Sequence, residues 1–178
     1  MEGMKDSRRR IMLKHGEFNP ILLRLALKED ASELNLYQTG YTDGKVIGFH
    51  PEFINSLNKD QLDTFQMHEC FHVAFLHIFS QRTKWMREED MMLFFEAEDH
   101  VVNNILVEAG FQAIPNWICD DKYAGWALES VFEDLKKSGK TAQRTIDYHL
   151  QPIDENTLTG EEKAELQKVQ KEWQKALS

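Results

Sequence analysis

The chain has 178 residues, about the length of one domain, and carries 21 Lys and Arg against 30 Asp and Glu, a net charge of −9. Because phosphate binding depends on clustered basic side chains, this balance argues against an extended nucleic-acid surface. No charged-then-apolar leader opens the chain and no apolar run is long enough to span a bilayer, so we expect a cytoplasmic protein without a membrane partner. The two cysteines, Cys70 and Cys119, do not make a disulfide framework.

The N-terminal third begins with an expected arm and a predicted helix. We expect residues 1–15 to form a flexible arm whose arginines at positions 8–10 are solvated. The segment Asn19–Asp30 has an Asn cap, Pro at the first helical position and an apolar stripe, which together predict a helix.

A β-hairpin is predicted next. Leu34, Leu36 and Gln38 alternate along the chain, Thr42–Gly44 has the composition of a turn, and Val46–Phe49 supplies the returning strand. The change of period from helical to alternating marks this segment as the β part of the fold.

The rest of the chain is predicted to be helical. Asn58 and Gln61 have the spacing of a capping box and open a long helix. Further helices are expected at residues 88–109, 127–137, 142–150 and 159–178. The last begins at a capping box of Thr159 and Glu162, and we expect it to pack on the body through an apolar stripe. The order of elements predicts a single α+β domain over residues 1–178.

The long helix contains the sequence HECFH, from His68 to His72, which is an H-E-x-x-H motif. Residues four apart lie on one helix face, about 40° apart, so His68 and His72 can hold one Zn²⁺ between them. Glu69 lies about 100° round from His68 and can take the proton of a zinc-bound water and pass it to the leaving amine. The alternative is a buried helix whose two histidines bond to backbone or water.

A catalytic zinc needs a third protein ligand, and the next helix offers the candidates. Asp99 lies within about 60° of each member of its apolar stripe, where a carboxylate needs a cation. That stripe consists of Met92, Phe95, Val102 and Leu106. We therefore expect Asp99 to be the third ligand, with Glu96 in reserve. His77 lies about 180° from His68 if the first helix continues, so we expect it to face away.

Two further positions have candidate roles around this metal. Asn103, one turn beyond Asp99, could hold Asp99 or a ligand histidine by a hydrogen bond, or could anchor loop backbone instead. Tyr123 could polarise the substrate carbonyl and the oxyanion, although a tyrosine packed on a loop is commoner. His100 is a weaker candidate for the same task.

These motifs resemble a known family, the zincin-type metallopeptidase domains often found N-terminal to von Willebrand factor A-like domains in bacteria. The resemblance runs from about Leu22 to Leu135 and rests on TDGKVIGFHPEF, HECFHVAFLH, AEDHVVNNIL and DDKYAGWALESVFEDL. The family pattern of His-Glu-x-x-His followed by Ala-x-Asp-x-x-x-Asn falls on six positions of this chain. They are His68, Glu69, His72, Ala97, Asp99 and Asn103.

The resemblance implies a zincin-like fold, with a small N-terminal sheet over the metal-binding helix and a mostly helical remainder. In that fold an edge strand lies over the metal helix and pairs with an extended peptide substrate. The strand expected to do this here consists of Val46, Ile47, Gly48 and Phe49. The chain contains no von Willebrand-type segment, and its compactness would suit a phage or mobile-element protein.

Three functions are compatible with these features. The first is a zinc-dependent peptidase in which His68, His72 and Asp99 hold the metal and Glu69 activates water. The second is a zinc hydrolase acting on a non-peptide amide. The third is a binding module, with or without metal, that recognises a partner protein.

Overall fold

The computed structural model describes residues 1–32, 35, 37–75, 77, 86–143, 145, 147 and 159–176. The helices are α1 (Glu2–Lys14), α2 (Asn19–Leu22), α3 (Pro51–Ser56), α4 (Lys59–Ala74), α5 (Glu88–Glu108), α6 (Leu128–Ser138) and α7 (Gly160–Ala176), with single 3₁₀ turns at Gly16–Phe18 and Asp121–Tyr123. The strands are β1 (Ala26–Glu29), β2 (Gly40–Thr42) and β3 (Val46–Phe49). The architecture is α+β, mostly helical, as the order of elements predicted.

The described strands form one small sheet in the order β1-β3-β2. β2 and β3 are the predicted hairpin, although its first strand is Gly40–Thr42. Asp43 closes the turn by accepting the backbone N–H groups of Lys45 and Val46, each at 2.8 Å. Leu34 and Leu36, where the first strand was expected to begin, lie outside the described residues, and Gln38 has a positive φ of 52°.

The strand expected to bind substrate is the central one. β3 pairs in parallel with β1 along one side and antiparallel with β2 along the other. Its backbone groups are therefore already used, and the expectation that Val46, Ile47, Gly48 and Phe49 form an exposed edge is wrong. The strand that makes β3 central is β1, which the periodicity of the sequence did not predict.

The predicted helix at Asn19–Asp30 is wrong in its second half, where the chain forms β1. The helix α2 ends at Leu22, a turn follows in which Arg24 N–H donates to Ile21 O, and the chain then extends from Ala26. The Asn and Pro signals correctly mark where the helix begins, but pairing with β3 overrides the helical stripe of the second half.

The N-terminal segment is a helix, α1, and not the flexible arm expected for residues 1–15. It buries Met4 and Ile11 against α4. The basic run is the reason for its docking: Arg10 pairs with Asp63 on α4 at 2.5 Å, and Arg8 donates to the carbonyl of Leu25 at 2.5 Å. Arg8 and Arg10 thus connect α1 to the body, whereas Arg9 is exposed to solvent as expected.

α4 is buried on nearly all sides, and its polar residues contact a different neighbour on each side. It begins at the predicted capping box of Asn58. Gln66 donates to Met4 O on α1 at 2.7 Å, and Thr64 donates to Gln112 O, after α5, at 2.7 Å. The sheet covers another side, where the ring of Phe65 lies directly beneath Gly40.

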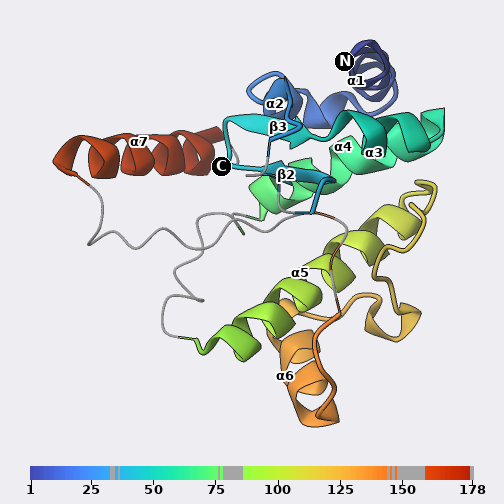
Figure 1. The fold of residues 1–178 in the computed structure, drawn as a ribbon, viewed down its shortest axis with the longest axis vertical. Coiled ribbons are helices and arrows are strands. Elements are labelled where there is room, and N and C mark those ends of the chain that lie inside the picture. Colours follow the sequence, from blue (N-terminus) through green and yellow to red (C-terminus); the bar gives the residue numbers. More distant parts are fainter. Residues whose placement is uncertain are drawn as a thin grey trace.

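The described residues form two apolar clusters, on either side of α5. Figure 1 shows α4 and the sheet on one side of α5 and α6 on the other. The larger one joins α1, α4 and the sheet, and the smaller one joins α5 to α6. α7 lies beside the hairpin, where Trp173 is buried and its indole N–H donates to Gly44 O at 2.8 Å. Within the described part of the chain, no helix has both the length and the apolar character needed to cross a membrane.

The boundaries of α5 and α6 agree with the sequence. α5 is followed by Gly110 with a φ of +84°, and α6 by Gly139 in the left-handed region. The prediction of a helix at residues 142–150 is wrong for the residues of this range that the structure describes. Residues 142, 143 and 145 are not helical, and Asp147 forms a parallel β-bridge with Gly40.

The close approach of the sheet to α4 gives a first testable expectation. A Cβ added at Gly40 would lie 2.2 Å from the ring of Phe65, which is fully buried against Phe53 and cannot move aside. Gly40→Ala should therefore lower the free energy of unfolding by about 1–3 kcal/mol. Urea unfolding followed by circular dichroism would measure this.

Gly3→Ala is the matched control. A Cβ at this position of α1 meets Leu62 at an ordinary 3.4 Å, so stability should be unchanged or higher by up to about 1 kcal/mol. Equal effects of the two substitutions would contradict the proposed tight contact between β2 and α4.

Candidate metal centre

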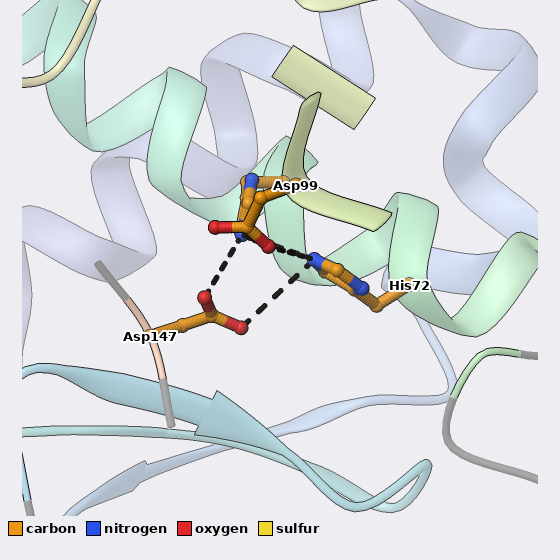
Figure 2. Close-up of side chains that lie close together, drawn as sticks. His72, Asp99 and Asp147 are labelled. Carbon is orange, nitrogen blue, oxygen red and sulfur yellow. Dashed lines mark hydrogen bonds and ion pairs between the residues drawn. The ribbon is translucent and has the colours of Figure 1, made fainter. Parts of the chain in front are cut away.

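Three parts of the fold bring ligand-type side chains together at one buried point. α4 supplies His68 and His72, α5 supplies Asp99, and the segment that pairs with β2 supplies Asp147. All four are buried, and one donor atom from each lies within 4.8 Å of the others. Figure 2 shows His72, Asp99 and Asp147 converging from these different elements.

The separations of the donor atoms match those around a small tetrahedral ion. The Nε2 atoms of His68 and His72 are 3.1 Å apart. An oxygen of Asp99 lies 3.5 Å from His72 Nε2, and an oxygen of Asp147 lies 3.4 Å from His68 Nε2. Ligands about 2.0–2.1 Å from a zinc ion at tetrahedral angles lie about 3.3 Å from one another. The residues present therefore fit zinc by donor type and by spacing.

Asn103 fixes the tautomer of His68. Its amide nitrogen donates to Ile118 O at 2.8 Å, which turns its Oδ1 towards His68 Nδ1, 2.9 Å away. His68 therefore donates its Nδ1–H to Asn103, which leaves the lone pair of Nε2 pointing into the cluster. The two roles considered for Asn103, support of a histidine and anchoring of loop backbone, are both fulfilled.

His72 has a second imidazole as its partner. Its Nδ1 lies 3.0 Å from Nδ1 of His77, and His77 Nδ1 lies 4.0 Å from a carboxylate oxygen of Glu98. The expectation that His77 faces away is wrong, because α4 ends at Ala74 and the chain no longer follows the helical angle. His77 thus supports His72 from the side opposite the two aspartates.

The electrostatics of the cluster favour a cation. Burial by itself disfavours a charged imidazole, but the carboxylates of Asp147, Asp99 and Glu69 outweigh it and raise the pKa of His68 to about 9. Several carboxylates in a fully buried volume repel one another unless positive charge is supplied. A divalent ion would supply it at the point where the two Nε2 atoms meet.

Glu69 is fully buried and directly follows His68 on α4. Its charge is one of the causes that raise the pKa of His68. It does not belong to the group of four donors, which agrees with the helical geometry that turns it about 100° away.

Two other predicted residues lie elsewhere. Glu96, the reserve ligand, accepts the backbone N–H of Gln143 at 2.7 Å and is not part of the donor group. Tyr123 is buried in the α5–α6 cluster, and its hydroxyl donates to Asp134 at 2.8 Å. The structure brings neither residue to the metal centre.

His100 has no place at the centre either, since its Nδ1 accepts the backbone N–H of Asp120 at 3.1 Å. Together with Glu96 and Tyr123 it lines a separate cavity of about 380 Å³ on the α6 side of α5. Their hydrogen bonds to described residues go to Gln143, to the backbone of Asp120 and to Asp134, and none goes to a donor residue of the metal centre.

Asp147 is the residue that sequence reasoning missed. It was assigned to a short helix, and no local motif singles out one aspartate at such a distance from the H-E-x-x-H sequence. Among the described contacts, its pairing with Gly40 is the one that brings it to the sheet edge, and its carboxylate lies 3.4 Å from His68 Nε2.

Comparison with known proteins agrees with this geometry. The model of a family described as "Putative metallopeptidase domain" matches residues 2–175. No curated protein and no solved structure matches the chain. The match includes all four donor residues and extends well beyond the motifs on which the resemblance rested. Because it covers nearly the whole sequence, the chain belongs to this putative metallopeptidase domain family.

Proposed function

We propose that the protein is a zinc-dependent peptidase of the H-E-x-x-H type. The observation that carries the proposal is the convergence of His68, His72 and Asp99, whose donor atoms lie 3.1, 3.5 and 3.9 Å from one another. These separations are close to the spacing of about 3.3 Å between ligands of one tetrahedral zinc ion. Membership of a metallopeptidase family supports the same reaction class.

Each residue has a distinct task in this reaction. A zinc ion would supply Lewis acidity, lowering the pKa of water and polarising a carbonyl. Glu69 is the general base, which takes the proton of the attacking water and delivers it to the leaving amine. Asn103 keeps His68 in the tautomer that binds metal, and His77 does the same for His72.

We further propose a zincin-like arrangement in which β2, and not β3, lies along the substrate. β2 is an edge of the sheet, and the sheet covers α4 through the contact of Gly40 with Phe65. An extended peptide could add to this edge by backbone hydrogen bonds.

One observation favours a second candidate, a metal-stabilised binding module. Asp147 adds a fourth donor residue to those the structure describes, and zinc sites with four protein ligands are usually structural. Such a protein would need zinc to fold and would not hydrolyse peptides.

Metal content is the first test. The untagged protein should hold about one zinc per chain, measured by elemental mass spectrometry. His72→Ala and Asp99→Asn should lose the zinc or bind it far more weakly, since each substitution removes one of the proposed zinc ligands. Zinc retained in full by Asp99→Asn would remove Asp99 from the site.

Glu69→Gln separates the two candidate functions. The amide cannot act as a base, so the variant should retain zinc. Its peptide-cleaving activity should fall by about a hundredfold or more. Cleavage of a peptide library, read by mass spectrometry, provides the assay. Full activity in Glu69→Gln would rule out the proposed mechanism, whereas a binding module would show no activity in either protein.

Asn103→Ala tests the support of His68. Loss of such a partner typically weakens metal binding by about 10–100-fold, which competition with a chromogenic chelator would measure. Asn104→Ala is the matched control. This neighbouring asparagine is also buried, but its amide donates to His100 O and Asp120 O, so zinc affinity should not change. Equal weakening by both substitutions would point to a general loss of structure.

A further inference from the structure

The segment that carries Asp147 occupies the outer edge of β2. Gly40 pairs with Phe49 of β3 on one side, so its parallel bridge with Asp147 must lie on the other. This outer edge is where the proposed function requires an extended substrate to bind. The chain's own Asp147 already lies there.

The same segment continues into an apolar groove. Thr145 is one wall of a groove of about 450 Å³, whose other walls include Phe53, Leu57, Ile114 and Pro115. Thr145 and Asp147 are each at most 5 % exposed, and Thr145 donates its hydroxyl to Asp147 O at 2.8 Å. Two residues of the chain therefore follow the route from groove to metal centre that a bound peptide would take.

Asp147 also completes the donor set. One of its oxygens lies 3.4 Å from His68 Nε2 and the other 3.9 Å from His72 Nε2, while Asp99 is nearer to His72. The two aspartates together thus serve both histidines. A catalytic zinc keeps one position open for water and substrate, and in this arrangement Asp147 fills it.

The two aspartates are held differently. Asp99 lies in the middle of the 21-residue helix α5, with Asn103 one turn away locking the same helix to His68. Asp147 belongs to the segment that pairs with β2 at Gly40. The position of Asp147 therefore coincides with the edge where a substrate strand would add, whereas that of Asp99 does not.

We propose that Asp147 is a fourth ligand by which the chain restrains its own active site. The proposal rests on the proposed peptidase function. Asp147 and an extended substrate compete for the same strand edge and the same coordination position, so the parent protein should be a less active enzyme than a variant without this carboxylate.

Cobalt-loaded protein and acetohydroxamate test this without relying on turnover. Acetohydroxamate binds a metal only where coordination positions are open, and the visible spectrum of Co²⁺ reports both metal binding and hydroxamate binding. Asp147→Ala should still bind one Co²⁺ through the remaining three ligands, with affinity lower by about tenfold or more. Its affinity for acetohydroxamate should exceed that of the parent by at least tenfold.

Two further variants serve as controls. Asp147→Asn preserves the size of the side chain but is a poorer ligand, so it should change in the same direction, and thermal melts would check that both variants fold. Asp121→Ala removes an exposed aspartate at the start of the 3₁₀ turn and should match the parent in every measurement.

The outcomes distinguish the two proposals. Equal hydroxamate affinity in the parent and both Asp147 variants would overturn the blocking role, as would loss of all Co²⁺ binding in folded Asp147→Asn. A parent that binds no Co²⁺ would overturn the metal centre and, with it, the blocking role. Increased hydroxamate affinity without peptide cleavage in Asp147→Ala would uphold the fourth ligand and overturn the peptidase.

Discussion

The arrangement depends on one electrostatic constraint, the burial of two imidazoles and several carboxylates between α4 and α5. His68 and His72 direct their Nε2 atoms at each other across 3.1 Å, and Asp99 lies against them in a volume closed to water. Such a group is unstable without positive charge, which a divalent ion held between the two Nε2 atoms would supply. Binding of the ion would therefore hold the two helices together as well as create a reactive centre.

The elements packed around α4 make this burial possible. A helix that carries polar residues on several faces can be buried only if each face finds its own partners, and α4 does so with α1, with the sheet and with α5. The arginines of α1 have a structural role for the same reason, because the bond of Arg10 to Asp63 holds α1 over the helix. α1 thus helps to bury α4 although it contributes no residue to the group of donors.

The sequence predicted what local spacing determines. Helical angles placed His68, His72 and Asp99 on facing sides of two helices, and the structure brings these side chains together. The capping box at Asn58 marked the start of α4 for the same reason, since its bonds lie within one turn. What failed depended on pairing between distant segments.

The failures at β1 and Asp147 share that origin, whereas the failure at His77 does not. β1 could be read as the end of a helix because strand pairing with β3 is invisible in a window of twelve residues. His77 was placed by extending an angle beyond the end of α4, where the rule no longer applies. Asp147 reaches the histidines only through a bridge to Gly40, more than a hundred positions earlier in the chain.

The contact of His72 with His77 has a spectroscopic consequence. A metal on Nε2 of His72 obliges its Nδ1 to carry the hydrogen and donate it across 3.0 Å, which moves the hydrogen of His77 to the far nitrogen. The tautomer of His77, read from its ¹⁵N chemical shifts, would then register whether the centre is occupied, from a position outside the coordination sphere.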